Sequence, residues 1–316
     1  MIDKIYNKII NNIDITHNEA YLLEKAPLDK LINYADKIRD KYCSNVFDIC
    51  SIINAKSGKC SQDCKFCAQS SHYNTDIKEY PLKDINEIVE NGLFMAKKGV
   101  KRFSIVTSGK SLNNNQIDTI CKAVKTIKEQ SDILVCVSLG LLSKESFAKL
   151  KESGVDRIHN NIETSKNYFS NICSTHTFED KVSALKIAKE NGFSLCSGII
   201  IGLGESIVDR IDAAFFLKEL HVDSVPINIL NSIKGTPFEN NERLSEEEIL
   251  RTCAIFRFIL PNIFLRLAGG RILLSDYGRK AFMSGINAVI TGDMLTTSGM
   301  NVDNDLEIIK NSGYIL

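Results

Sequence analysis

The stretch SGKCSQDCKFCAQSS, residues 57–71, places three cysteines on one short loop directly after an apolar run. Cys60, Cys64 and Cys67 follow the spacing C-x3-C-x2-C, and the next cysteine along the chain is Cys121. Structural zinc sites and cubane iron–sulfur clusters both take four ligands. The loop therefore supplies one ligand fewer than a complete set.

Three interpretations of this loop compete. A structural zinc site usually uses two C-x2-C pairs, and the loop contains one. Three cysteines within eight residues are a poor match for thiols that serve only as small buried side chains. An iron–sulfur cluster with one iron left open to a small molecule accounts for the missing ligand, and we favour it.

The surrounding chain alternates short β-branched runs with longer amphipathic stretches. The runs predict strands over 47–55, 102–107, 133–139, 155–162, 194–201, 222–229, 263–267 and 288–291. The amphipathic stretches predict helices over 85–98, 116–130, 144–153, 178–191, 207–220, 246–259, 277–284 and 305–311. Eight strand–helix units predict an α/β fold, a (β/α)8 TIM-type barrel, with the cysteine loop at its C-terminal face, where active sites lie.

The segment before the first strand has helical patterns of its own. We expect an N-terminal helical extension over 1–45 and one barrel domain over 46–316. The N-terminus lacks the apolar core of a secretory signal, and no run approaches the ~18 apolar residues of a membrane span. A cytoplasmic protein with no membrane partner is expected, in which the ten cysteines are thiols or metal ligands.

Composition narrows the classes of partner. The 39 basic and 39 acidic side chains cancel, and a nucleic-acid-binding protein usually carries a basic excess. With 44% hydrophobic and 25% charged residues, the chain has the composition of an ordinary globular protein. No nucleic-acid partner is expected.

Polar residues recur at every second position along several predicted strands, so they share one face. The row that we assign to the barrel interior comprises Ser104, Cys136, His159, Asn161, Glu163, Cys196, Gly198, Asn228 and Arg266. A packed barrel interior is dominated by branched apolar residues, so this row predicts a site. The alternative is a register shifted by one, with these side chains buried against helices. Cys136 and Cys196 together with Arg266 suggest a second metal centre, although each cysteine alone also suits a small buried hydrophobe.

The C-x3-C-x2-C loop, with Phe66 before its third cysteine, resembles the radical S-adenosylmethionine (SAM) superfamily. The resemblance implies a [4Fe-4S] cluster whose open iron binds the amino and carboxylate groups of SAM. Electron transfer to the sulfonium then yields a 5′-deoxyadenosyl radical, chemistry that belongs to the cofactors.

Six segments in order resemble the biotin synthase family over most of the barrel. They are SGKCSQDCKFCAQSS, HNNIETS, CSGIIIGLGES, VPINILNSIKGTP, RLAGGR and LTT. The resemblance implies insertion of one sulfur between C6 and C9 of dethiobiotin, with the sulfur supplied by an auxiliary iron–sulfur cluster. It also implies a flavodoxin-like or ferredoxin-like electron donor and a homodimer.

The resemblance implies a role for each matching residue. The ligands of the [4Fe-4S] cluster would be Cys60, Cys64 and Cys67. The ligands of the auxiliary cluster, a [2Fe-2S] cluster in the family, and hence the catalytic residues, would be Cys136, Cys196 and Arg266. The residues that bind SAM would be Phe66, Asn161, Glu163, Gly198 and Ile200, although the segment from Gly198 also suits a plain strand-to-helix turn. The residues that bind dethiobiotin would be Lys56, Asn161 and Asn228.

Three positions depart from the family pattern. Ser104 stands where the family has a cysteine ligand of the auxiliary cluster, and serine is a poor substitute for a thiolate. The family's NHN triplet reads HNN at 159–161. Cys173 is an extra cysteine, which either packs in the core or replaces the lost thiolate, leaving the composition of the auxiliary cluster open. Cys43, Cys50, Cys121 and Cys253 are interpreted as core residues.

Two rival functions remain. A hydrogenase-maturation radical SAM enzyme shares the barrel and the loop, but is not expected to keep Lys56, Asn228 and Arg266 together. A non-catalytic iron–sulfur redox protein leaves the polar barrel interior unexplained.

Overall fold

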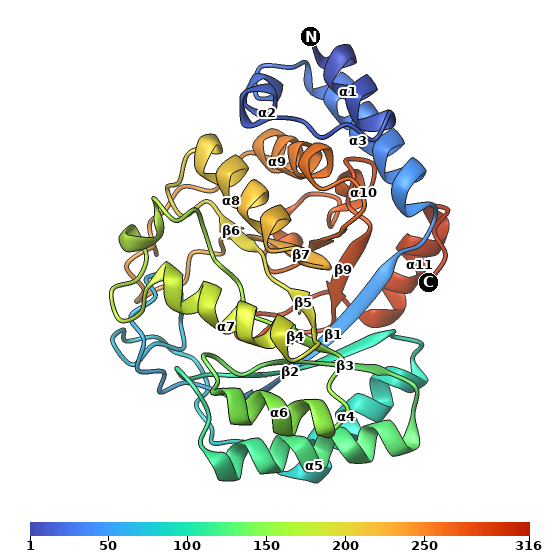
Figure 1. Ribbon diagram of the computed structural model, residues 1–316. Coiled ribbons are helices and arrows are strands. Elements are labelled where there is room, and N and C mark those ends of the chain that lie inside the picture. Colours follow the sequence, from blue (N-terminus) through green and yellow to red (C-terminus); the bar gives the residue numbers. More distant parts are fainter.

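The computed structural model describes all 316 residues and contains one sheet of parallel strands (Figure 1). Its strands are Asp48–Lys56 (β1), Arg102–Thr107 (β2), Leu134–Ser138 (β3), Arg157–His159 (β4), Ser194–Cys196 (β5), Ile199–Ile201 (β6), Ser224–Ile229 (β7), Phe264–Leu267 (β8) and Ala288–Thr291 (β9). The strands β5 and β6 occupy one strand position, since two residues separate them and both pair with β7. Pairing of β5 with both β4 and β7 closes the sheet into a barrel with eight strand positions, which confirms the predicted fold class.

Helices follow the strands and surround the barrel (Figure 1). They are Ile85–Lys97 (α4), Asn114–Gln130 (α5), Lys144–Glu152 (α6), Phe178–Glu190 (α7), Ile207–Glu219 (α8), Glu246–Ile259 (α9), Arg279–Phe282 (α10) and Val302–Asn311 (α11). Several begin at a capping box, in which the side chain of the Ser, Thr or Asn before the helix accepts a hydrogen bond from the backbone N–H of the third helical residue. The side chain of that third residue accepts a hydrogen bond from the backbone N–H of the capping residue. These sequence-encoded caps explain why the predicted helix starts agree closely with the structure.

The N-terminal extension consists of three helices, Ile2–Ile10 (α1), His17–Leu23 (α2) and Leu28–Cys43 (α3). α3 packs against α9 and α2 packs against α8, so the extension covers one side of the helical layer (Figure 1). The domain boundary at residue 45 stays a prediction.

Three predicted elements differ from the structure. The fourth strand ends at His159 instead of residue 162, and the chain rejoins the sheet through a bridge between Glu163 and Ile199. The fifth strand is interrupted between Cys196 and Ile199, where Gly198 packs so closely against β7 that a Cβ atom there would lie 1.9 Å from the carbonyl oxygen of Pro226. The helix predicted over 277–284 is a single turn, α10.

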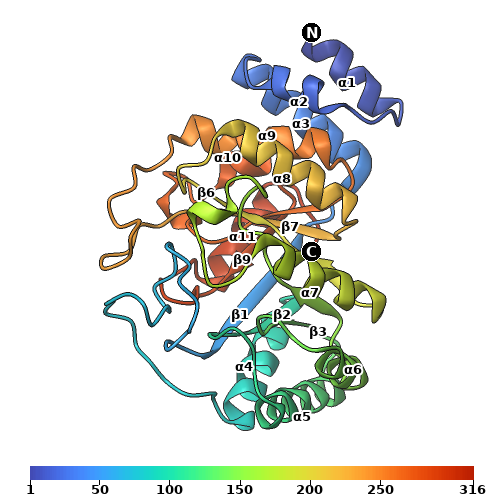
Figure 2. The same ribbon diagram turned by 60° about the vertical axis from the view of Figure 1, so that its left-hand side comes forward.

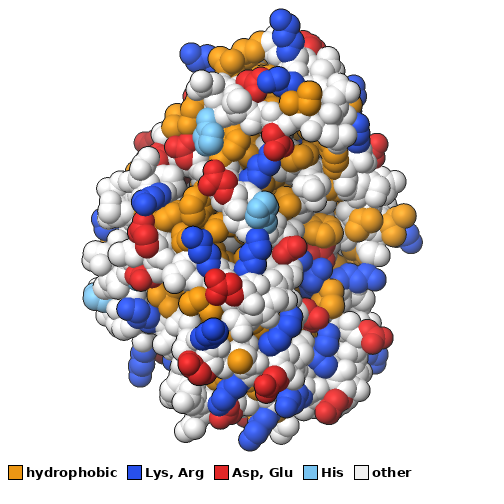
Figure 3. Space-filling view, viewed as in Figure 1, with side chains coloured by type: hydrophobic (Ala, Val, Ile, Leu, Met, Phe, Trp, Pro, Cys, Tyr) orange, Lys and Arg blue, Asp and Glu red, His pale blue; other side chains and the backbone are white.

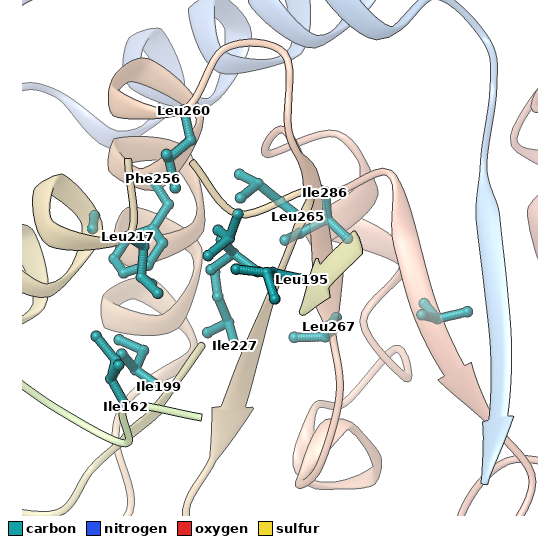
Figure 4. Close-up of a cluster of buried hydrophobic side chains, with 14 of the residues drawn as sticks. Ile162, Leu195, Ile199, Leu217, Ile227, Phe256, Leu260, Leu265, Leu267 and Ile286 are labelled. Carbon is teal, nitrogen blue, oxygen red and sulfur yellow. The ribbon is translucent and has the colours of Figure 1, made fainter. Parts of the chain in front are cut away.

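The main hydrophobic core lies between the strands and the helices. Leu195, Ile227 and Leu265 project from the outer faces of their strands toward side chains such as Phe256 of α9 (Figure 4). Because strand side chains alternate, this apolar outer face leaves the polar row on the inner face, as predicted. Each Å² of apolar surface buried in this outer layer stabilises the folded barrel by about 25 cal/mol. Because the outer layer supplies this stability, the interior is available for polar groups.

The surface carries mixed charge. In the view of Figure 3, basic and acidic side chains are interspersed, as expected for a chain with a net charge of zero. None of the helices combines the length and the apolar character needed to span a membrane.

Candidate functional site

A cavity of ≈ 400 Å³ occupies the barrel interior and opens at the C-terminal ends of the strands. Its wall includes the cysteines of the loop after β1, the inward-facing residues of the strands, and the segment 294–297. Figure 2 shows the loop after β1 and the loop after β7 on the same side of the molecule. The structure thus brings most of the predicted site residues to one cavity.

Cys60, Cys64 and Cys67 all line this cavity and are half-buried. Backbone hydrogen bonds hold the loop: the N–H of Cys67 donates to the carbonyl of Cys64 at 2.9 Å, and the N–H of Cys60 donates to the carbonyl of Gln69 at 2.9 Å. Phe66 lines the cavity beside them. Three thiols from one loop that line the same cavity fit an iron–sulfur cluster with one open iron.

Asp63 ties the cysteine loop to the segment after β4. Its Oδ1 accepts from the N–H groups of Ser174 and Thr175, at 2.9 and 3.1 Å. Burial raises the pKa of this carboxyl, but the hydrogen bonds from Ser174, Cys173 and Thr175 lower it more, so the pKa lies well below its usual value. Asp63 therefore holds the loop as a charged acceptor.

Cys173 lies in this same segment, between the 3-10 turn Phe169–Asn171 and α7. Its Sγ lies 3.8 Å from Sγ of Cys64 and 3.2 Å from Nδ1 of His176, and it does not line the cavity. The structure does not bring it to Cys136 and Cys196. The prediction that Cys173 replaces the missing auxiliary thiolate gains no support from this position and stays a prediction.

Three buried thiols lie deeper in the barrel, from Cys50 of β1, Cys136 of β3 and Cys196 of β5. Cys136 and Cys196 were predicted to face inward, and they do. Cys50 was interpreted as a core residue, but it lines the cavity, and Cys136 together with burial raises the pKa of its thiol well above the usual value. This thiol lowers the pKa of Cys136 more than burial raises it, and the nearby arginines lower it further.

Four charged side chains lie beside these thiols. Asp48 of β1 accepts from Arg102 at 2.8 Å and from Arg266 at 2.6 Å, and Arg157 lies 3.9 Å away. Arg266 also donates through Nη1 to the carbonyl of Val289 at 2.6 Å. Burial alone would lower the pKa of Arg266, but Asp48 raises it, so the guanidinium stays charged. The three arginines reduce the electrostatic cost of placing thiolates here.

Cys196 and His159 form a second titrating pair. Burial raises the pKa of Cys196, but His159 and the arginines lower it more, to about 7. In return, Cys196 raises the pKa of His159 against the effect of burial. The cysteine is thus prepared to act as a thiolate ligand.

Ser104 of β2 lies beside Cys136 of β3. In the sheet register it pairs with Ile52 on one side and with Cys136 on the other, and it lines the cavity. The residue that replaces the expected cysteine therefore faces the site, as predicted, with an oxygen in place of sulfur.

Polar groups after β4 face the upper part of the cavity. Asn161 Oδ1 accepts from the N–H of Gly198 at 3.0 Å, and Glu163 adopts a left-handed φ of 69°. Glu163 Oε2 is buried without a hydrogen-bond partner in the chain. A buried carboxylate oxygen left unpaired is costly, so it fits a ligand hydroxyl or amine. Ile200 lines the cavity, whereas Gly198 does not and instead permits the close approach of Pro226.

Lys181 was missed from the sequence. Its Nζ lies 3.6 Å from Glu163 and donates to Asn160 Oδ1 at 3.1 Å, and both asparagines 160 and 161 line the cavity. This lysine lies in the first turn of α7, outside every motif recognised in the sequence, and so gives no local signal. The alternation of side chains could have identified Cys50 and Arg157 from the sequence, because each occupies a strand position that faces the barrel interior.

Hydrogen bonds within the fold use half of the hydrogen-bonding capacity of the Asn228 carboxamide. It donates to the carbonyl of Ile199 and accepts from the N–H of Gly269, both at 3.0 Å. A carboxamide has two donor hydrogens and two acceptor lone pairs, so one of each remains for a ligand. Lys56, at the end of β1, places its Nζ beside Gly109 of the cavity wall.

Family comparisons match both halves of the barrel. The Radical SAM superfamily matches residues 55–217, and the Biotin and Thiamin Synthesis associated domain matches residues 226–315. Biotin synthase of Clostridium botulinum is 53% identical over 99% of this chain and 98% of its own length. Biotin synthase of Alkaliphilus metalliredigens is 54% identical over 100% of this chain and 99% of its own length.

Solved structures share the fold at low identity. Methylornithine synthase superposes with a TM-score of 0.85 at 20% identity, over 98% of this chain and 96% of its own. A maturase of the [FeFe]-hydrogenase superposes with a TM-score of 0.84 at 18% identity, over 98% of this chain and 74% of its own. These likenesses concern the fold alone.

Proposed function

Because the chain belongs to the biotin synthase family, we propose that it inserts one sulfur atom between C6 and C9 of dethiobiotin to form biotin. The observation that carries the proposal is the single cavity that joins the loop cysteines to the buried thiols of the barrel. A substrate held between the loop cysteines and the buried thiols would face both groups.

The residues present fit two iron–sulfur clusters and SAM. Cys60, Cys64 and Cys67 would hold a [4Fe-4S] cluster, and Cys136 and Cys196 would hold the auxiliary cluster with Arg266 beside it. When bound, the first cluster supplies the electron that cleaves SAM and the second supplies the sulfur. The protein's part is to orient the substrate and to keep water away from the reacting carbons.

SAM would lie over the loop after β4. Glu163 offers an unpaired carboxylate oxygen that can accept from ribose hydroxyls, and Asn161 is fixed by Gly198 for the same purpose. Phe66 and Ile200 would contact the apolar edges of the cofactor.

Dethiobiotin would lie below SAM, with its ureido ring against Asn228. The ring offers both donors and acceptors, which the two remaining sites of the carboxamide match. Asn161 is placed to contact both ligands, and Lys56 offers a point charge for the carboxylate tail. A flavodoxin-like or ferredoxin-like reductant, a homodimer and a cytoplasmic location complete the proposal, and they rest on the family alone.

The function is tested with reconstituted protein, SAM and a reductant under anaerobic conditions. We expect 5′-deoxyadenosine to be released in a dethiobiotin-dependent manner and biotin to form. Release that does not respond to dethiobiotin, or that occurs without biotin, would point to another radical SAM reaction. A protein that binds iron and sulfide but releases no 5′-deoxyadenosine would be a redox protein.

Replacing Asn228 by leucine is expected to raise the KM for dethiobiotin by about tenfold, because each lost hydrogen bond is worth roughly 0.5–1.5 kcal/mol. The dissociation constant for SAM should stay unchanged, since the cofactor lies above. Asn115→Leu, exposed on α5, serves as the control. Equal weakening of both ligands in Asn228→Leu would mean that the variant disturbs the barrel, because Asn228 also bonds Ile199 and Gly269.

A further inference from the structure

The auxiliary site contains two of the thiols expected from the sequence, and an oxygen at Ser104 in place of a third. Iron–sulfur clusters are held by thiolates, and serine oxygen is a harder ligand. A third sulfur is nevertheless present in the cavity wall, on Cys50 of β1.

The position of Cys50 follows from the alternation of β1. Ile49, Ser51 and Ile53 face outward into the helical layer, while Cys50 and Ile52 face the cavity. Cys50 pairs in register with Arg102 of β2, one pleat below the level of Ser104 and Cys136. Its side chain nevertheless lines the same cavity wall as Cys136 of β3 and Cys196 of β5.

Basic side chains line the cavity at this level. Asp48, two residues earlier on the same face of β1, holds the guanidinium groups of Arg102 and Arg266. Both arginines line the same cavity as Cys50 and Cys136, so a negatively charged cluster bound here would have cations in its wall. Cys50 is 7% exposed, so it is a buried, cavity-facing sulfur among cations, unlike the core cysteines such as Cys253 on α9.

We propose that Cys50 is a ligand of the auxiliary iron–sulfur cluster, supplying with Cys136 and Cys196 the thiolate that Ser104 cannot supply. The proposal rests on the proposed function, which requires that such a cluster exists. It replaces Cys173 in this role, because Cys173 lies behind Cys64 and outside the cavity.

The test compares Cys50→Ser with Cys121→Ser, a buried cysteine on α5 away from the cavity. Each variant is reconstituted anaerobically, and iron, sulfide and Mössbauer spectra are measured per chain. We expect Cys50→Ser to lose or alter the auxiliary signal and to keep the loop cluster, and Cys121→Ser to match the wild type. The double variant Cys50→Ser with Ser104→Cys should regain the signal, since position 104 faces the same cavity. An auxiliary spectrum and iron content in Cys50→Ser identical to those of Cys121→Ser would overturn the proposal.

A second measurement uses the wild-type chain and so does not depend on the folding of a variant. Protein labelled with ¹³C at the cysteine β-carbons shows hyperfine-shifted signals only from cysteines bound to iron. We expect three such signals from the loop and three from the barrel, and only two from the barrel would contradict the assignment of Cys50. The absence of any auxiliary cluster in the wild type would instead remove the proposed function itself.

Discussion

Replacing Cys67 by serine is expected to reduce the release of 5′-deoxyadenosine to undetectable levels, while replacing Cys173 by serine keeps it. Both residues lie close to the loop cluster site, but only Cys67 lines the cavity. Three thiolates on one loop leave one iron open for SAM, and removal of one thiolate leaves too few to hold a cubane. Cys173 contacts Cys64 from behind, with Sγ atoms 3.8 Å apart, and so should not be a ligand.

The measurement pairs product release with Mössbauer spectra recorded before and after SAM is added. The spectrum of Cys173→Ser should still change on addition of SAM, as in the wild type. If Cys173 were the fourth ligand of the cubane, the wild-type spectrum would not respond to SAM and the serine variant would acquire an altered cluster. Either result would remove the open iron on which SAM binding depends.

Replacing Asp48 by asparagine is expected to destabilise the folded chain by about 3–5 kcal/mol, because it leaves buried arginines without their counter-ion. Asp48 is the carboxylate that Arg102 and Arg266 contact at 2.8 and 2.6 Å, and both its side chain and that of Arg266 are buried. Asparagine keeps the shape and removes the charge. The free energy of unfolding is measured by chemical denaturation of the cluster-free protein.

Asp118→Asn is the matched control. Asp118 pairs with Lys149 at 2.7 Å, but both side chains are about half exposed, and such pairs contribute little. We expect no measurable change in stability for this variant. A loss in Asp48→Asn no larger than in Asp118→Asn would show that water reaches the barrel floor and solvates the arginines.

The same carboxylate gives a pH dependence. Burial raises the pKa of Asp48, but Arg266 and Arg102 lower it more, so the folded pKa lies below the ordinary value of 3.8. Its contribution is therefore complete above pH 3.8 and is lost as the pH falls through the folded pKa. The stability difference between wild type and Asp48→Asn should shrink in this acidic range, and a difference that stayed constant would contradict the linkage.

Much of the barrel could be predicted from the chain alone, because its signals are local. The run over 246–259 predicts α9 to the residue, since Ser245 and Glu248 form the capping box that starts it. The strand after residue 155 was predicted too long, because the turn at Glu163 depends on a hydrogen bond from its N–H to the carbonyl of Gly198, in the break between β5 and β6. Apolar periodicity does not record such non-local bonds.

The spacing of Cys60, Cys64 and Cys67 by itself predicted a loop with three metal ligands, because all three lie within eight residues, and the structure brings all three to one cavity. The alternation of side chains between the two faces of each strand likewise predicted that Cys136 and Cys196 lie inside the barrel. Only the tertiary structure decided which of the extra cysteines joins which group. Cys173 is remote in sequence from both, yet Asp63 holds its segment against Cys64. Cys50 lies at an inward position of its strand, but only closure of the sheet places it in the same cavity wall as Cys136 and Cys196.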